Sequence, residues 1–199
     1  PQARDTAWSA GTIKLEVNAT DTVRRIIQVK ETIPVSGTGP LTLLLPEWLP
    51  GNHAARGAID KLAGLTVTAD GKPVSWERDA LDVFAFHIAV PQGASNVVVQ
   101  FQFLAPTEGA QGRIVMTDAL LNLQWNNVSL YPAGYYTRRI PIQASVTLPQ
   151  GWKAATALRG KSTGATVAYE QTDYETLVDS PIFAGQHSKS IDLGHDVTL

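Results

Sequence analysis

The chain contains no cysteine among its 199 residues. This absence excludes a disulfide framework, a cysteine-ligated zinc site and thiol catalysis together. Long apolar runs are also missing, because no stretch approaches the roughly 20 residues that a membrane-spanning helix needs, and we expect no membrane span. Strong charge of one sign is missing as well: the formal net charge is -2, and basic residues cluster only in pairs such as Arg24-Arg25. We therefore expect no nucleic-acid partner.

A zinc-binding signature is absent too. The chain has four histidines, at His53, His87, His187 and His195, and none begins a His-Glu-x-x-His pair. That pattern places two imidazoles on one helical face, so without it we expect no metal ligands and no cofactor in this chain. His87 lies in an alternating segment, where a core or surface role is the simplest interpretation.

One short segment matches two catalytic motifs. Gly160-Lys161-Ser162-Thr163-Gly164 satisfies the G-x-S-x-G pattern of a nucleophile elbow and resembles the end of a phosphate-binding loop. Both motifs need a helix directly afterwards, but residues 165–170 have β character. We interpret the segment as a hairpin tip. The carboxylates are scattered, and we assign no catalytic residue.

What the chain does contain is many short segments with a period of two. Ile13, Leu15 and Val17 alternate with polar residues, and Asp70-Gly71 separates two alternating segments as a tight hairpin turn does. Further strands are expected at residues 83–90, 97–104, 120–125, 140–148 and 166–169. The pattern predicts one all-β domain over residues 1–199, with antiparallel sheets packed as a β-sandwich.

One or two short helical turns are expected within this β domain. Thr172-Asp173-Tyr174-Glu175 fits a capping box, and Pro181 bars continuation of the helix. A second turn is expected within residues 55–62.

The most unusual segment is Pro46-Glu47-Trp48-Leu49-Pro50-Gly51-Asn52-His53, which directly follows an apolar strand. Two prolines stiffen this loop, and Gly51 permits a turn with positive φ. Because tryptophan is highly buried on average, we predict that Trp48 packs inward. The alternative is a stiff loop that presents a surface to a partner.

This loop, followed by Arg56, resembles the Pro-x-Trp-x-Pro-Gly-x-Tyr segment in the amino-terminal domain of glycyl aminopeptidases, the family-61 zinc metallopeptidases of the gluzincin type. The resemblance continues through Leu130-Tyr131-Pro132, through the strand that ends in Leu-Pro-Gln-Gly-Trp at Trp152, and through residues 174–182. His53 departs from the family pattern, because it stands where the family has tyrosine. The family's catalytic domain, with its His-Glu-x-x-His helix and a third glutamate ligand, is not in this sequence.

The resemblance implies a saddle-like β domain that precedes a zinc-binding catalytic domain in a bacterial parent protein. This domain would be inactive alone, and zinc would be held by the full-length parent, which would hydrolyse amino-terminal glycine or alanine residues. Its partners would be the catalytic domain of the same polypeptide and a peptide substrate. The resemblance also implies a periplasmic or secreted location.

Two groups of site residues follow from the resemblance. Asn122 and Gln124 occupy the region where related family-1 aminopeptidases hold the substrate amine, although both residue types are mostly exposed and an exposed sheet face is the alternative. The surface expected to face the catalytic domain comprises Gly51, Asn52, His53, Arg56 and Asp179.

A function of another class stays open. An independent β-sandwich could bind a carbohydrate or a protein through exposed Trp48, Tyr135 and Tyr136, since exposed aromatic side chains suit such binding. A purely structural accessory domain is the third possibility.

Overall fold

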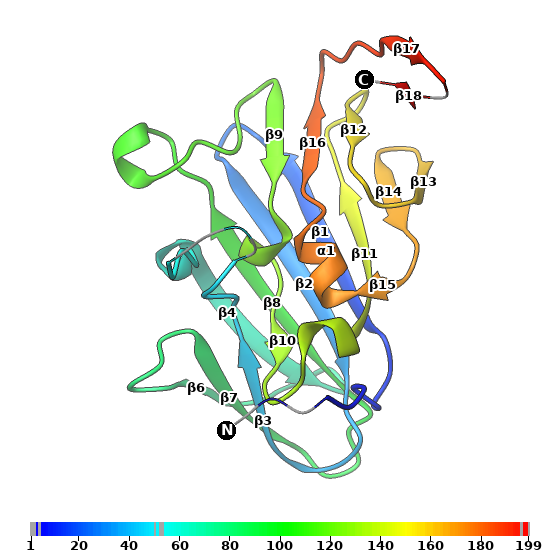
Figure 1. The fold of residues 1–199 in the computed structure, drawn as a ribbon. Helices are drawn as coiled ribbons and strands as arrows, with labels where there is room; N and C mark the ends of the chain where they lie inside the picture. Colours follow the sequence, from blue (N-terminus) through cyan, green and yellow to red (C-terminus); the bar gives the residue numbers. More distant parts are fainter. Residues whose placement is uncertain (1–2, 4, 50, 52–53, 196, 199) are drawn as a thin grey trace.

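The computed structural model describes residue 3 and residues 5–49, 51, 54–195 and 197–198. The chain forms a large nine-stranded sheet with smaller sheets packed on one of its faces (Figure 1). The large sheet has the strand order β13-β14-β11-β1-β2-β8-β4-β5, with β15 paired to β11. Its strands are β1 (Ile13–Asp21), β2 (Ile26–Pro34), β4 (Leu62–Ala69), β5 (Lys72–Pro73), β8 (Asn96–Leu104), β11 (Pro141–Thr147), β13 (Gly160–Thr163), β14 (Thr166–Tyr169) and β15 (Thr172–Asp173).

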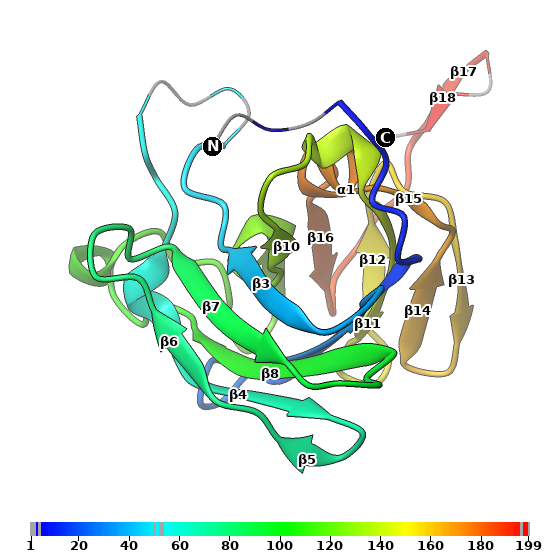
Figure 2. The same cartoon turned by 90° about the horizontal axis from the view of Figure 1, so that it is seen from below.

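Two smaller sheets cover the inner face of the large sheet, as the view from below shows (Figure 2). The four-stranded sheet contains, in order, β10 (Tyr131–Pro132), β3 (Gly39–Leu44), β7 (Ala85–Val90) and β6 (Trp76–Arg78). The three-stranded sheet contains β12 (Lys153–Ala155), β16 (Ile182–Gly185) and β9 (Leu120–Leu123). A separate hairpin follows, made of β17 (Asp192–Gly194) and β18 (Val197–Thr198).

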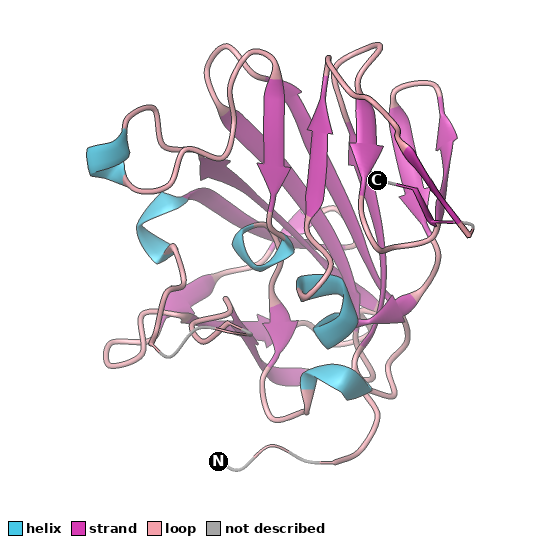
Figure 3. Cartoon of the chain, turned by 45° about the horizontal axis from the view of Figure 1, so that its top comes forward, coloured by secondary structure: helices cyan, strands magenta, loops and turns pink. Residues whose placement is uncertain are grey.

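The alternating sequence pattern produces the core directly. In β1, residues Ile13, Leu15 and Val17 are at most 3% exposed, while the residues between them face solvent. Because successive side chains of a strand point to opposite faces, each such strand contributes one apolar row to the space between the layers. The all-β prediction is therefore confirmed, and strands dominate the chain (Figure 3).

Among the described residues, all paired strands are antiparallel except one pair, which the sequence did not predict. β1 and β11 run parallel, with Ile13 opposite Ile142 and Val17 opposite Val146. These strands lie far apart in the sequence, so no hairpin fixes their relative direction. The predicted tight turn at Asp70-Gly71 is confirmed, because both residues have positive φ, 50° and 74°, and join β4 to β5.

The helical segments are short. They are α1 (Tyr174–Val178) and the 3₁₀ turns η1 (Ile59–Lys61), η2 (Gly109–Gln111), η3 (Trp125–Asn127) and η4 (Thr137–Arg139). The expected turn within residues 55–62 is thus confirmed as η1. None of the helices in the described part of the chain has the length and apolar character needed to cross a bilayer.

The predicted capping box before α1 is wrong in its register. Thr172 belongs to β15, and the N-cap is Asp173, whose Oδ1 accepts a hydrogen bond of 2.9 Å from the backbone N–H of Thr176. Glu175 does not reach back to the cap but accepts a hydrogen bond from Thr137 Oγ1. Aspartate caps a helix as well as threonine does, and the helix begins one residue later than the capping-box pattern predicted.

The segment at residues 160–164 is a hairpin, as expected. β13 and β14 pair from Gly160 opposite Tyr169 to Thr163 opposite Thr166, and Gly164 at the tip has φ of 61°. Ser162 therefore lies within an exposed strand, which does not have the geometry of a nucleophile elbow.

Candidate functional site

Hydrogen bonds hold together the two ends of the loop between Leu45 and Gly57. The carbonyl of Glu47 accepts hydrogen bonds from the backbone N–H groups of Arg56 (2.9 Å) and Gly57 (3.0 Å). A side chain at position 57 would overlap the carbonyl oxygen of Pro46 and lie 2.6 Å from Phe84 Cε1, so the close packing here requires glycine. The base of the loop is therefore tightly packed.

Trp48 lies in this loop and is 64% exposed, so the prediction that it packs inward is wrong. Trp48 forms an antiparallel bridge with Ala55, and this pairing of the two arms of the loop carries the indole away from the core. Gly51 has φ of 73°, which confirms the predicted positive φ. Gly51 and Arg56 are exposed, whereas Asn52 and His53 lie outside the described residues.

Asn122 lies in β9, opposite Phe183 of β16. Its backbone N–H donates to the carbonyl of Val115 at 2.7 Å, and only 8% of the residue is exposed. The alternative of an exposed sheet position is therefore wrong for Asn122. Its Oδ1 atom is buried and has no hydrogen-bond partner among the described residues. A buried amide oxygen without a partner is uncommon, because its desolvation is uncompensated.

Gln124 follows β9 and is half-buried. It precedes η3, and its carbonyl accepts a hydrogen bond of 3.1 Å from the backbone N–H of Asn127. Asn122 and Gln124 therefore share one end of β9.

Asp179 is the C-terminal residue that closes α1 and is exposed. Its backbone N–H donates to the carbonyl of Glu175 at 3.0 Å. Among the described residues, no hydrogen bond or ion pair links Asp179 to the loop at residues 51–56. Of the expected interface residues, Gly51 and Arg56 thus lie in one segment and Asp179 in another.

A buried polar network, which the sequence did not predict, links α1 and η3 to β2. Glu31 of β2 is fully buried, and its Oε2 accepts a hydrogen bond of 2.9 Å from the backbone N–H of Leu130. Ser129 Oγ donates to the carbonyl of Trp125 at 2.7 Å and shares a hydrogen bond of 2.8 Å with the hydroxyl of Tyr174. The network joins β2, the segment before β10, and α1.

The electrostatics of the network follow from its burial. Burial raises the pKa of Glu31 to about 8, and the N–H of Leu130 opposes this rise only in part. Burial, followed by the nearby Glu31, also raises the pKa of Tyr174 well above its ordinary value. Both groups therefore hold their protons at neutral pH, and the interior keeps no net charge there.

The sequence contains a pattern that indicates a buried position for Glu31. This residue occupies the inward row of β2 together with Ile27, Val29 and Ile33, where a carboxylate breaks an apolar period of two. Such a residue at a core position requires hydrogen-bond partners from elsewhere in the chain.

His87 is an exposed residue of β7, which confirms the surface interpretation. Its Nε2 lies 2.8 Å from Asp79 Oδ2, and its Nδ1 lies 3.0 Å from Thr42 Oγ1. The hydrogen bond with His87, followed by those from the backbone N–H groups of Asp82 and Leu81, lowers the pKa of Asp79 to about 2. The arrangement fixes the turn between β6 and β7.

Metal-ligating groups do not gather anywhere in the part of the chain that the structure describes. No three His, Asp or Glu side chains there lie close enough together to hold an ion. The described residues therefore do not fit a zinc centre, since such a centre needs at least three protein ligands.

Comparison with known proteins shows which family this chain is similar to. A family model described as "Peptidase M61 N-terminal domain" matches residues 14–186. A comparison with the curated proteins finds no match.

Solved structures show the same fold at low identity. An aminopeptidase N family protein from Idiomarina loihiensis is 18% identical with a TM-score of 0.76, covering 94% of this chain and 31% of that chain. Native leukotriene A4 hydrolase from Saccharomyces cerevisiae is 14% identical with a TM-score of 0.53, covering 98% of this chain and 31% of that chain. This chain thus spans about a third of the length of these solved chains.

Proposed function

Because the chain belongs to the family of Peptidase M61 N-terminal domains, we propose that it is the non-catalytic amino-terminal domain of a glycyl-aminopeptidase-like zinc metallopeptidase. One observation carries this proposal: the family match runs from residue 14 to residue 186, which is from β1 to just beyond β16. It therefore includes all three of the packed sheets. The described residues offer no metal site, so the proposal assigns the chemistry to another domain.

The domain would form one wall of the substrate cleft. An exopeptidase must block the far end of its cleft and offer acceptors to the substrate ammonium group, and a neighbouring domain can provide both. Gln124 and Asn122, together at one end of β9, are the proposed acceptors. Zinc in the catalytic domain would supply activated water for hydrolysis.

Kinetics of the full-length parent test this role. Gln124→Ala should lower kcat/KM for a glycyl substrate at least tenfold, mainly through KM, because an acceptor for the bound amine is lost. Asn122→Ala should act in the same direction. Gln28→Ala is the matched control, since Gln28 is an exposed amide on the outer face of the large sheet and should leave both constants unchanged. Unchanged kinetics in Gln124→Ala and Asn122→Ala would contradict the role.

A carbohydrate- or protein-binding module is the second candidate. Exposed Trp48 favours it, and so does a hollow of about 690 Å³ on the outer face of the large sheet, whose lining includes the amides of Gln28, Gln100 and Gln102 beside the charged Glu16 and Lys30. Trp48 is not among the residues that line this hollow, however, so the aromatic ring and these amides do not form one site. Tyr135 and Tyr136 are half-buried and not exposed as expected, because Tyr135 packs against Trp8 and Tyr136 lies under Arg138. The first candidate is therefore preferred.

A periplasmic or secreted location is part of the proposal and rests on the family resemblance. Fractionation of cells that make the full-length parent tests it: the protein should be released with the periplasm or the medium, and recovery with the cytoplasm would contradict it.

A further inference from the structure

We propose that the outer face of β9 and β16, centred on Phe183 and Leu120, is the surface on which the catalytic domain of the same polypeptide packs. This inference rests on the proposed function and gives the domain contact a place in the fold. It also differs from the sequence-based interface at residues 51–56 and Asp179, because it puts the main contact on a rigid sheet.

The pairing register of β9 and β16 defines which side chains lie on this face. Phe183 lies opposite Asn122, and Gly185 lies opposite Leu120. Directly opposed residues of an antiparallel pair project from the same face, so Phe183 and Leu120 share the outer face of the sheet. The alternate residues, Leu121, Leu123, Ile182 and Ala184, are at most 3% exposed and face the core.

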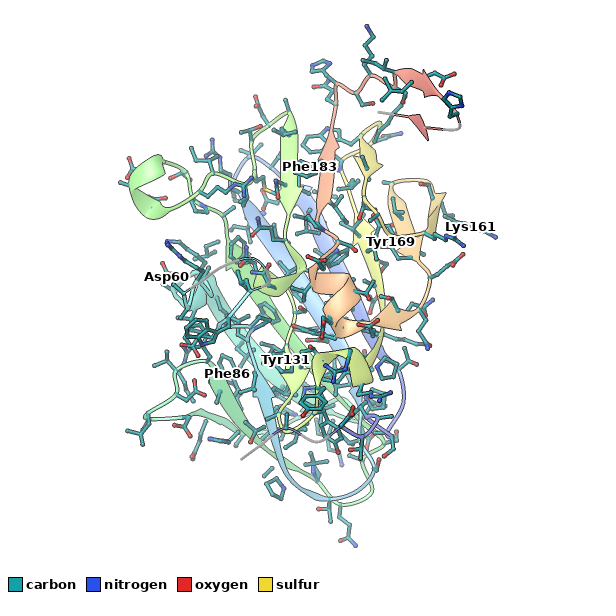
Figure 4. The ribbon with its side chains drawn as sticks, viewed as in Figure 1. Asp60, Phe86, Tyr131, Lys161, Tyr169 and Phe183 are labelled. Carbon is teal, nitrogen blue, oxygen red and sulfur yellow. The ribbon has the colours of Figure 1, made fainter. Side chains whose placement is uncertain are left out.

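The outer face of β9 and β16 carries large apolar side chains, although a sheet face in contact with solvent is normally polar. Phe183 is 52% exposed and Leu120 is 54% exposed, and Asn122 between them exposes only 8%. Ala155 of β12, opposite Phe183 on its other side, adds a methyl group to the same row. The labelled Phe183 lies on β16 in the front layer of the molecule (Figure 4). Two large apolar side chains on neighbouring strands form a patch of the kind that marks an interaction site.

The outer face of the large sheet supplies the contrast. It carries Glu16, Gln28, Lys30 and Gln100, as expected for a sheet with one solvated side. The outer face of the large sheet is therefore polar, as expected for a solvated surface, whereas the outer face of β9 and β16 is apolar. A domain that packs on this chain would cover the apolar surface and leave the polar one in water.

The catalytic domain is inferred as the occupant of this face from the length of similar chains. This chain covers 31% of the solved aminopeptidase N family chain, so that protein carries about two thirds of its residues outside this fold. The segment after β16 also exposes apolar side chains, at Ile191 (42% exposed) and Leu193 (57% exposed). The loop that contains Trp48 projects from the same side (Figure 2). One large partner could therefore contact the sheet and the loop together.

Cysteine labelling of the full-length parent tests the inference. This chain has no cysteine, so Phe183→Cys and Leu120→Cys each add one thiol to it, and any thiols of the catalytic domain are counted in the unsubstituted parent. Leu81→Cys is the control, because Leu81 is 98% exposed on the turn between β6 and β7. The thiols at positions 183 and 120 should react with a maleimide at least tenfold more slowly than the thiol at position 81. Equal rates would overturn the inference.

Hydroxyl-radical footprinting of the unsubstituted parent gives a second readout that does not depend on how well a variant folds. Phe183 and Leu120 should be oxidised less than Leu81, and equal oxidation would overturn the inference. Protection that disappears on dilution would identify a second copy of the chain as the occupant and would also overturn it.

Peptidase activity, measured on the same preparation, separates the two proposals. An active enzyme with freely reactive positions 183 and 120 would contradict the docking face alone. A protein that protects these positions but hydrolyses no glycyl substrate would contradict the proposed function and, with it, the identity of this partner.

Discussion

The carboxylate of Glu31 accepts a buried hydrogen bond of 2.9 Å from the backbone N–H of Leu130, which is 99 residues further along the chain. Leu130 directly precedes β10, and Ser129 beside it bonds to Tyr174 at the start of α1. Two of the segments that carry the family resemblance, at residues 130–132 and 174–182, are therefore held against β2 by one polar network.

The pKa of Glu31 makes stability depend on pH. Its pKa is raised to about 8 in the folded chain from an ordinary value of 4.5, so the stabilising effect is fully present below about pH 4.5. This effect is lost as the pH rises through 8, because the unfolded chain releases a proton that the folded chain keeps. The free energy of unfolding should fall with a slope of up to about 1.4 kcal/mol per pH unit in that window.

Glu31→Gln removes this titration and nearly preserves the shape of the side chain. The variant should therefore show a flatter pH profile between pH 5 and 8, measured by urea unfolding of the chain at several pH values. The same slope in both proteins would show that Glu31 does not hold its proton in the fold.

The hydroxyl of Tyr174 should contribute about 1 kcal/mol to the free energy of unfolding, as is typical of a hydrogen bond between neutral groups. Tyr174→Phe removes its bond with Ser129 and should lower the urea midpoint accordingly. Tyr136→Phe, at a half-buried ring packed under Arg138, is the control and should change stability by less than about 0.5 kcal/mol. An equal effect of the two substitutions would contradict the network.

Trp48 should be dispensable for folding. Trp48→Ala should change the free energy of unfolding by less than about 0.5 kcal/mol, as for other exposed positions. The matched control is Trp125→Ala, because Trp125 is fully buried and donates from Nε1 to the carbonyl of Ser180 at 3.0 Å. That substitution should cost about 3–5 kcal/mol. A large loss of stability in Trp48→Ala would mean that the indole packs on the core.

Gly57 should tolerate no side chain. Gly57→Ala would push a methyl group into the Pro46 carbonyl and the Phe84 ring, and we expect a cost of about 1–3 kcal/mol. Gly109→Ala is the control, since nothing lies within 4 Å of a Cβ there and the backbone is not in the left-handed region. Thermal unfolding of both variants measures the difference. Equal melting temperatures would contradict the tight base of the loop.

Local patterns in the sequence predicted much of the fold. The strands follow from alternation, as in β1, and the turn at Asp70-Gly71 follows from the local preference for positive φ. These features depend on residues close together in the chain. The parallel pairing of β1 with β11 and the bond between Glu31 and Leu130 depend on distant residues, and no local pattern specifies them.

The site was less predictable than the fold. Trp48 was assigned to the core from its residue type, but the paired arms of its loop expose it. The alternative interpretation puts Asn122 at an exposed position, but only 8% of the residue is exposed. The exposed Phe183 could be recognised only once the register of β16 with β9 had defined the outer face. The roles of Gln124, Gly51, Arg56 and Asp179 stay predictions, as do those of Asn52 and His53.

Metal content and peptidase activity, measured together on the full-length parent and on this chain of 199 residues, test the central claim most directly. We predict about one zinc ion per molecule of the parent, with hydrolysis of a glycyl substrate that a chelator abolishes and added zinc restores. The chain alone should hold no stoichiometric zinc and should hydrolyse nothing. Tight zinc binding with turnover by the isolated chain, or an inactive and zinc-free parent, would contradict the account.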